Sequence, residues 1–155
     1  GATNAGITQR ALASFRGVEN VTSDDVRNLT DDEIFAIYDK FYIQPSNADG
    51  IDSLRLRAAF LSFAVNGGTN RATRTLEAAA ELSTDGNLDG DDLAAINARM
   101  EARGDAFIVE FNCRILAFYR GLSFWDTFER GWTRRLQAFT PEGDLGACAQ
   151  SADNE

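Results

Sequence analysis

The sequence contains no histidine, one methionine and only two prolines in 155 residues. Without an imidazole, acid–base chemistry must rest on carboxylates, and a common nitrogen ligand of metals is missing. Basic residues are also few, with 15 lysines and arginines against 24 aspartates and glutamates and a formal charge of −9. A nucleic-acid-binding surface extending over the chain would be basic. We therefore expect carboxylate chemistry and no nucleic acid among the partners.

Long apolar runs are also missing. No run approaches the roughly 20 residues that span a bilayer, and the N-terminus has no signal-peptide pattern. We therefore expect no membrane insertion. The content of 44% hydrophobic and 25% charged residues is ordinary for a globular protein, and this length fits one domain with a substantial core.

The two cysteines, Cys113 and Cys148, lie far apart in the sequence and lack the short spacing of a metal site. Cys113 falls inside an apolar helical pattern, where a buried free thiol is the more common finding. Pairing in an oxidising compartment is the alternative. The spacing itself does not distinguish a free from a paired state.

Hydrophobic periodicity and capping signals predict an all-α chain, or α+β at most with one small N-terminal hairpin near residues 1–8. A capping box formed by Thr30 and Glu33 opens one helix, and Thr69 or Asn70 is expected to cap another. The predicted helices cover residues 7–15, 31–42, 51–66, 69–82, 105–122 and 123–139.

The last two predicted helices carry the strongest apolar patterns. In the final helix, Trp125, Phe128, Trp132 and Leu136 share one face, which is typical of a packed core. Residues 58–65 carry no charge and predict a central buried helix. Residues 140–155 are small and acidic, and we expect a loose tail there.

The segment Asp85-Gly86-Asn87-Leu88-Asp89-Gly90 reproduces the start of a calcium-binding loop, with oxygen donors at its first, third and fifth positions. The twelfth position, which should be a glutamate, is Ile96, and the usually apolar eighth position is Asp92. These departures favour a turn followed by a helix that Asp89 caps. We expect no metal site and no cofactor.

Five short segments along the chain stand out together. They are Gly1-Ala2-Thr3-Asn4 with Gly6-Ile7-Thr8, Leu29-Thr30 with Glu33 and Ile37-Tyr38, Phe63-Ala64-Val65-Asn66 with Gly68, Asp85-Gly86 with Asp89-Gly90, and Arg120-Gly121-Leu122 with Gly131-Trp132. In this order they resemble glycoside hydrolase family 108, whose members are bacterial and phage N-acetylmuramidases. The resemblance implies a lysozyme-like helical domain over residues 1–139, with about 60–139 similar to the peptidoglycan-binding region of that family.

The resemblance implies muramidase-type cleavage of the peptidoglycan glycan strand, in which a glutamic acid protonates the leaving sugar oxygen. In the family this glutamate precedes the segment that corresponds to Gly1-Ala2-Thr3-Asn4, so we expect it upstream of Gly1. None of four acidic residues that follow Gly1 stands at the position of the family's catalytic glutamate; these residues are Glu19, Asp24, Asp25 and Glu33.

Two departures favour an alternative function. The family usually has an aspartate where Ser62 stands and a tryptophan where Ile43 stands. The alternative is a non-catalytic lysozyme-like protein that binds the cell wall or builds a phage particle, and a partner chain that supplies the missing helix is a third reading. In each case the resemblance implies action at the bacterial cell wall, in the periplasm, outside the cell or on a phage.

The candidate substrate-binding residues of the N-terminal half are Thr3, Asn4 and Thr8, with Tyr38 and Tyr42. The resemblance places the first segment in a strand that lines the cleft, where hydroxyl and amide groups position a water or a sugar. Turn formation explains the same threonine and asparagine residues equally well. The tyrosines offer aromatic surface to a sugar, but at helical spacing they are more typical of half-buried core.

The candidate substrate-binding residues of the C-terminal half are Asn66, Arg134 and Arg135. Asn66 ends a buried helix before two glycines, where helix capping is at least as good an interpretation as ligand contact. The two arginines lie near Trp125 and Trp132 in the one basic, aromatic stretch of an acidic chain. Such a stretch suits a glycan bearing muramyl carboxylates, although a solvated rim around a tryptophan core also fits it.

Overall fold

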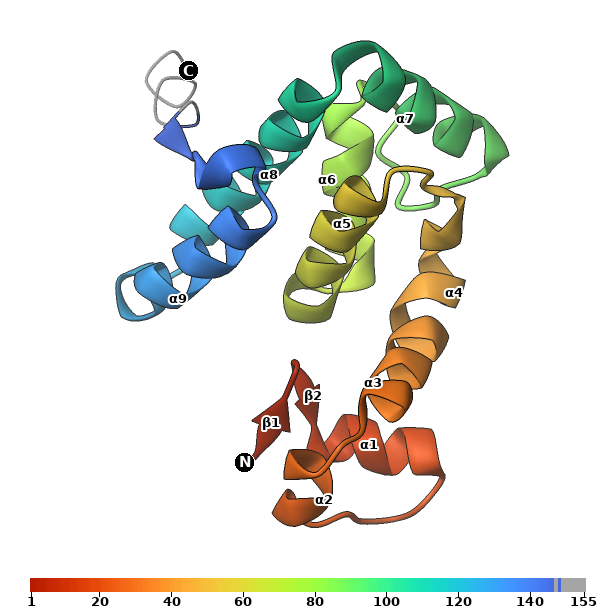
Figure 1. Cartoon of the computed structure of the whole chain (residues 1–155), viewed down its shortest axis with the longest axis vertical. Helices are drawn as coiled ribbons and strands as arrows, with labels where there is room; N and C mark the ends of the chain where they lie inside the picture. The colour runs from red at the N-terminus through yellow and green to blue at the C-terminus, as the bar shows by residue number, and fades with distance from the viewer. Residues whose placement is uncertain (147, 149–155) are drawn as a thin grey trace. The chain divides into compact units, whose positions relative to one another are not determined.

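The computed structural model describes residues 1–146 and 148 (Figure 1). The described residues form helices and one two-stranded antiparallel sheet, which confirms the all-α class with a small hairpin. The chain divides into two compact units, Gly1–Pro45 and Ser46–Glu155. The helix predicted to end at residue 42 is longer than expected, because the chain stays helical through Pro45 to Ser46 and so crosses this boundary. The single domain over residues 1–139 stays a prediction.

The hairpin of the first unit consists of β1, Thr3–Asn4, and β2, Ile7–Thr8, with Thr3 opposite Thr8. Its two-residue turn has positive φ at both positions, 51° at Ala5 and 80° at Gly6. Turns of this kind match the twist of the paired strands. Glycine adopts this conformation freely, whereas for alanine it costs about 1 kcal/mol.

Helix α1, Gln9–Arg16, begins where the hairpin ends. The Thr8 hydroxyl accepts a hydrogen bond from the Ala11 amide at 3.1 Å, and Gly17 ends the helix with a φ of 69°. The predicted helix started at residue 7, which is wrong by two residues because Ile7 and Thr8 pair in β2 instead.

The short helix α2, Ser23–Arg27, was not predicted. It begins with a reciprocal capping box: the Thr22 hydroxyl accepts from the Asp25 amide at 3.0 Å, and the Asp25 carboxylate accepts from the Thr22 amide at 2.7 Å. Because a threonine followed three residues later by an acidic residue marks a helix start, the signal for α2 was present in the sequence.

Helix α3, Asp31–Tyr38, begins at Thr30, whose hydroxyl accepts from the Glu33 amide at 3.2 Å. The predicted capping box is half wrong, because the Glu33 side chain pairs with Arg16 instead of returning to Thr30. The helix then widens into a π-helical turn, Asp39–Ile43, and continues as α4, Gln44–Ser46. The buried core of this unit consists of Ile7, Leu12, Val26, Leu29 and Ile37.

The second unit opens with a 3-10 turn, Ala48–Gly50, and the long helix α5, Leu54–Gly67. Helix α5 starts three residues later than predicted because the Ser53 hydroxyl caps it by accepting from the Leu56 amide at 3.2 Å. Its buried residues include Phe60 and Phe63, as expected for a central helix.

Helix α6, Thr69–Ala79, packs against α5 (Figure 1). The predicted caps Thr69 and Asn70 are wrong, because the helix begins directly after Gly68 without a side-chain cap. It also ends before the predicted residue 82, since Glu81 adopts a positive φ of 60°.

Helix α7, Gly90–Arg103, begins at Asp89, which forms a capping box with Asp92, and this confirms the predicted cap. Helix α8, Asp105–Arg120, and helix α9, Trp125–Ala138, lie close to their predicted limits. Helix α8 packs against α5, α6, α7 and α9 and contributes seven buried residues. None of the described helices combines the length and apolarity that a bilayer crossing requires.

The predicted core face of α9 is wrong for most of its length. Leu136 is the buried residue that the structure assigns to this helix. Phe128 is 48% exposed, Phe124 at the helix start is 64% exposed, and both tryptophans are half-buried. Helix α9 packs on α8, and this contact leaves most of the apolar stripe of α9 exposed or half-buried.

The chain after α9 returns to α8 through a 3-10 turn, Pro141–Gly143. Buried Asn112 donates hydrogen bonds to the Phe139 carbonyl and the Thr140 hydroxyl, both at 3.0 Å. We expected this tail to be loose. Its described part is instead attached to α8. Residues 147 and 149–155 of that tail lie outside the described residues.

A disulfide joins Cys113 of α8 to Cys148, with Cα atoms 5.0 Å apart. The interpretation of Cys113 as a buried free thiol is therefore wrong. Cys113 is only half-buried and lies next to Asn112, where the returning chain meets α8. The helical pattern marked the apolar neighbours of Cys113, but it carried no information about the returning chain.

Candidate functional site

Two of the three predicted hairpin residues have structural hydrogen bonds. The Asn4 side-chain amide donates to the carbonyls of Val26 and Arg27, at 3.1 Å and 3.4 Å, and so attaches the hairpin to α2. Thr8 caps α1. Thr3 is exposed, and within the described residues its hydroxyl has no hydrogen-bond partner. Of this set, Thr3 has the side chain most available to a ligand.

Tyr38 and Tyr42 lie together beside the hairpin turn. The Tyr38 hydroxyl donates a hydrogen bond to the Ala5 carbonyl. The two rings meet edge to face, with centroids 6.0 Å apart and an interplanar angle of 79°. Both side chains are half-buried, and burial raises the pKa of Tyr42. The structure therefore brings both tyrosines and the turn into one surface region of the first unit.

Two half-buried carboxylates of the first unit, those of Glu33 and Asp25, have neighbours that stabilise their charged form. Arg16 binds Glu33 through two hydrogen bonds, at 2.8 Å and 3.0 Å, and this pairing lowers the pKa of Glu33. Hydrogen bonds from the Thr22 backbone and hydroxyl lower the pKa of Asp25. A general acid must keep its proton near neutral pH, so neither carboxylate has a suitable environment.

The two remaining acidic residues considered for catalysis are exposed. Asp24 forms an ion pair with Arg27 at 2.8 Å, and Glu19 lies in the segment between α1 and α2. The four acidic residues considered for catalysis therefore either pair or cap within the fold or face the solvent.

Asn66 lies in the last turn of α5, in the second unit. Its side-chain amide donates to the Ser62 carbonyl at 2.6 Å, one turn back, which is a bond within its own helix. The residue that follows it, Gly67, lines a polar groove that the sequence did not indicate. The groove is lined by Gly67, Gly68, Asn70, Arg71, Arg74, Thr75 and Thr84.

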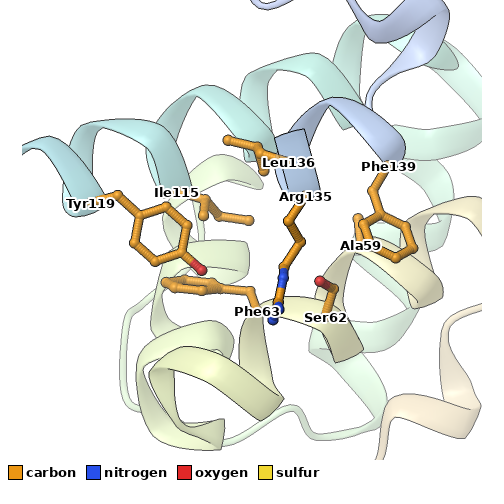
Figure 2. A pocket seen from close by; sticks show the side chains of 8 residues that line it. All are labelled: Ala59, Ser62, Phe63, Ile115, Tyr119, Arg135, Leu136 and Phe139. Atoms are coloured by element: carbon orange, nitrogen blue, oxygen red, sulfur yellow. The ribbon is translucent and has the colours of Figure 1, made fainter. Parts of the chain in front are cut away.

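Arg134 and Arg135 are exposed on α9, and neither forms an ion pair with a carboxylate of the described residues. Arg135 contributes to a pocket between α5, α8 and α9, where its side chain extends toward Ser62 and Phe63 (Figure 2). The pocket residues are Ala59, Ser62, Phe63, Ile115, Tyr119, Arg135, Leu136 and Phe139.

The pocket joins two positions that the sequence treated separately. Ser62, where the family usually has an aspartate, lies on the same pocket wall that Arg135 reaches (Figure 2). Burial raises the pKa of Tyr119, and the charge of Arg135 opposes that shift. The arginine therefore lies close enough to the phenol to affect it electrostatically.

A row of aromatic rings extends from this pocket along α9. Tyr119 stacks on Trp132 with centroids 4.8 Å apart, and Trp132 stacks on Phe128 at 5.3 Å. Phe128 contacts the exposed Phe124 edge to face at 6.5 Å. We call Tyr119, Trp132, Phe128 and Phe124 the aromatic row. Flat apolar rings beside uncompensated arginines suit a sugar polymer that carries carboxylates.

Comparisons with known proteins identify what the chain is similar to. The model of the family described as glycosyl hydrolase 108 matches residues 1–68, which include the hairpin, both tyrosines and Asn66. Among solved structures, that of Brucella abortus SagA has 30% sequence identity and a TM-score of 0.72, and the match covers 88% of this chain and 76% of that chain. No curated protein matches the chain significantly.

Proposed function

This chain belongs to glycosyl hydrolase family 108, a family of peptidoglycan hydrolases with a lysozyme-like fold, and on that basis we propose that it acts in N-acetylmuramidase cleavage. The bond cleaved in this proposal joins N-acetylmuramic acid to N-acetylglucosamine. Water is added across the bond, and a carboxylic acid protonates the leaving sugar oxygen. The family match over residues 1–68 is the observation that carries the proposal.

The general acid in this proposal is a glutamate upstream of Gly1. The family resemblance is the reason for this position, and two carboxylates considered in its place have structural roles: Arg16 pairs with Glu33, and Asp25 completes the capping box of α2. The one described carboxyl group with a clearly raised pKa, about 6, is that of Glu77. Its side chain is fully buried in the second unit, so a polymer cannot reach it.

Substrate binding in this proposal uses the side chains that the fold leaves available. In the first unit, Thr3 offers an exposed hydroxyl, and Tyr38 and Tyr42 offer aromatic surface near the hairpin turn. In the second unit, Arg134 and Arg135 offer positive charge to muramyl carboxylates. The exposed Phe124 and Phe128 of the aromatic row offer apolar ring surface to the sugar rings. Asn4, Thr8 and Asn66 support the fold through the hydrogen bonds described above.

The proposed place of action is the bacterial cell wall, in the periplasm, outside the cell or on a phage particle. The Cys113–Cys148 disulfide supports this proposal, because disulfides persist in oxidising compartments and are rare in the cytosol.

Analysis of digested peptidoglycan tests the proposed specificity. The complete gene product is incubated with purified peptidoglycan, and the products are reduced with borohydride and identified by mass spectrometry. New N-acetylmuramitol ends are expected. New N-acetylglucosaminitol ends, or cleavage confined to the peptides, would contradict the muramidase assignment. The intact mass is measured beforehand, because a value above 16.9 kDa identifies residues outside Gly1–Glu155.

The second candidate function is non-catalytic binding of the cell wall, including a structural role in a phage particle or with a partner chain. Ser62 and Ile43, which replace an aspartate and a tryptophan usual in the family, favour it. The exposed Phe124 and Phe128 of the aromatic row favour it as well. Sedimentation with insoluble peptidoglycan distinguishes the two functions. Binding by the complete gene product without any new reducing ends would support the second.

A further inference from the structure

A carboxylate with unusual surroundings lies at the end of α6, away from the pocket and the aromatic row. Glu77 is 0% exposed. One of its oxygens accepts a hydrogen bond from the Gly86 amide at 2.8 Å, and the other, Oε2, has no hydrogen-bond partner among the described residues. A buried carboxylate oxygen without a partner is energetically costly, so a native chain usually supplies an ion, a water or a proton there.

Two further carboxylates lie close to Glu77. One oxygen from each of Glu77, Asp85 and Asp92 lies within 4.8 Å of the other two. Oxygen ligands of calcium lie about 2.3–2.6 Å from the ion, so ligands on opposite sides are separated by roughly 5 Å. All three oxygens can therefore contact one ion of this size.

From this geometry we propose that Glu77, Asp85 and Asp92 bind one calcium ion. A site of carboxylate oxygens without nitrogen or sulfur selects a hard cation. Magnesium requires near-ideal octahedral ligands at about 2.0–2.1 Å, whereas calcium tolerates irregular geometry and six to eight ligands. Asp85 is exposed and Asp92 half-buried, so water can complete the coordination from the solvent side.

This site differs from the loop that the sequence suggested. The calcium-loop pattern drew its donors from Asp85, Asn87 and Asp89, and its incomplete match led us to expect no metal. In the structure, the Asp89 carboxylate instead accepts from the Asp92 amide at 2.8 Å and caps α7. The donor that completes the cluster is Glu77, which comes from the preceding helix.

The charges around the site favour a cation over an empty cluster. Burial is the main cause that raises the pKa of Glu77, and the neighbouring Asp85 adds to it. The opposing charge is Arg74, whose guanidinium donates to the carbonyls of Thr84 and Asp85. One arginine does not neutralise three carboxylates. A proton shared between Glu77 and Asp85 is the competing occupant, and calcium binding would displace it.

Calorimetric titration of the metal-free full chain with CaCl2 and MgCl2 tests the proposal, with thermal unfolding as the second readout. We expect one calcium ion per chain with a Kd of about 1 mM or tighter, and weaker binding of magnesium. At about 10 mM calcium, Tm should rise by about 3–10 °C, because the ion binds only the folded state.

Variants locate the site. Asp85→Asn and Glu77→Gln should each weaken calcium binding by about tenfold or more, since ligand charge determines affinity. Glutamine keeps the acceptor for the Gly86 amide, which favours folding of that variant. Asp91→Asn is the matched control, because Asp91 is exposed in the first turn of α7 and outside the cluster.

Two results would overturn the proposal. The first is a full chain that shows neither heat of binding nor a Tm shift with calcium, while Glu77→Gln raises Tm in metal-free buffer; this would assign the cluster to a shared proton. The second is unchanged calcium affinity in both variants, which would place the ion elsewhere. Both readouts are independent of glycan cleavage.

Discussion

The Tyr38 hydroxyl donates a hydrogen bond to the Ala5 carbonyl and thereby links α3 to the hairpin turn. Ala5 has a positive φ of 51°, which is unfavourable for alanine. A bond to the carbonyl of this residue helps to hold the turn in place. The hairpin that carries Thr3 is therefore held in part by Tyr38, which lies 33 positions after Ala5 in the sequence.

Replacing Tyr38 tests this link. Tyr38→Phe removes the hydroxyl and keeps the ring that contacts Tyr42, so we expect the free energy of unfolding to fall by about 1 kcal/mol. Ala5→Gly is the companion variant and should stabilise the turn by about 1 kcal/mol, because glycine tolerates positive φ. Urea unfolding measures both; an unchanged midpoint for Tyr38→Phe would contradict the role given to this bond.

Thr3 and Asn4 are neighbours for which we expect opposite effects. Asn4→Ala removes a donor from two carbonyls of α2 and should lower the free energy of unfolding by about 1–3 kcal/mol. Thr3→Val should leave it within about 0.5 kcal/mol, because the side chain is exposed. If Thr3 contacts the glycan, Thr3→Val should bind insoluble peptidoglycan less well than the parent while its free energy of unfolding stays the same. Loss of stability in Thr3→Val would refute this division of roles.

The Arg16 pairs predict a specific dependence of stability on pH. The folded-state pKa values of Glu33 and Asp25 are lowered, so their stabilising contribution is present above the ordinary carboxyl range and is lost as pH falls through the lowered values. Arg16→Gln should be less stable than the parent at pH 7, and the difference should shrink below about pH 4. Urea unfolding across this range measures it. A difference that stays constant with pH would contradict the pairing.

Removing the disulfide should destabilise the second unit. The Cys113–Cys148 bond closes a loop with a sequence separation of 35, and loops of this size contribute about 2–4 kcal/mol in the chain-entropy model. Cys113→Ser with Cys148→Ser should therefore lower Tm, and a reducing agent should lower the Tm of the parent but not of the variant. Equal Tm values for parent and variant would show that the bond contributes no stability.

The arginines of α9 predict a charge-dependent interaction with the cell wall. Arg134→Gln with Arg135→Gln should weaken sedimentation with purified peptidoglycan by about tenfold, and the loss should be smaller at high salt. The matched control is Arg99→Gln with Arg103→Gln, because it removes the same charge from arginines that pair with Glu81 and Glu110. Equal weakening in both pairs would indicate a nonspecific effect of net charge.

Residues close together in the sequence explain where prediction succeeded. The cap at Asp89 and the limits of α8 and α9 follow from hydrogen bonds and side-chain spacing within one or two turns, which a linear pattern contains. Even a missed element, α2, carried its signal in Thr22 and Asp25. The π-helical turn at Asp39–Ile43 had no such signal, because nothing in its composition distinguishes it from an ordinary helical turn.

The sequence by itself determined the helical class, the hairpin, the approximate position of most helices and the family resemblance, because these depend on local periodicity, capping and short motifs. Only the tertiary structure decided that Cys113 pairs with Cys148, that Arg135 extends toward Ser62, and that Glu77 joins Asp85 and Asp92. It also decided that most of the aromatic stripe of α9 stays exposed or half-buried. Each of these is a contact between segments separated along the chain, and the spacing of residues within one segment carries no information about which other segment packs against it.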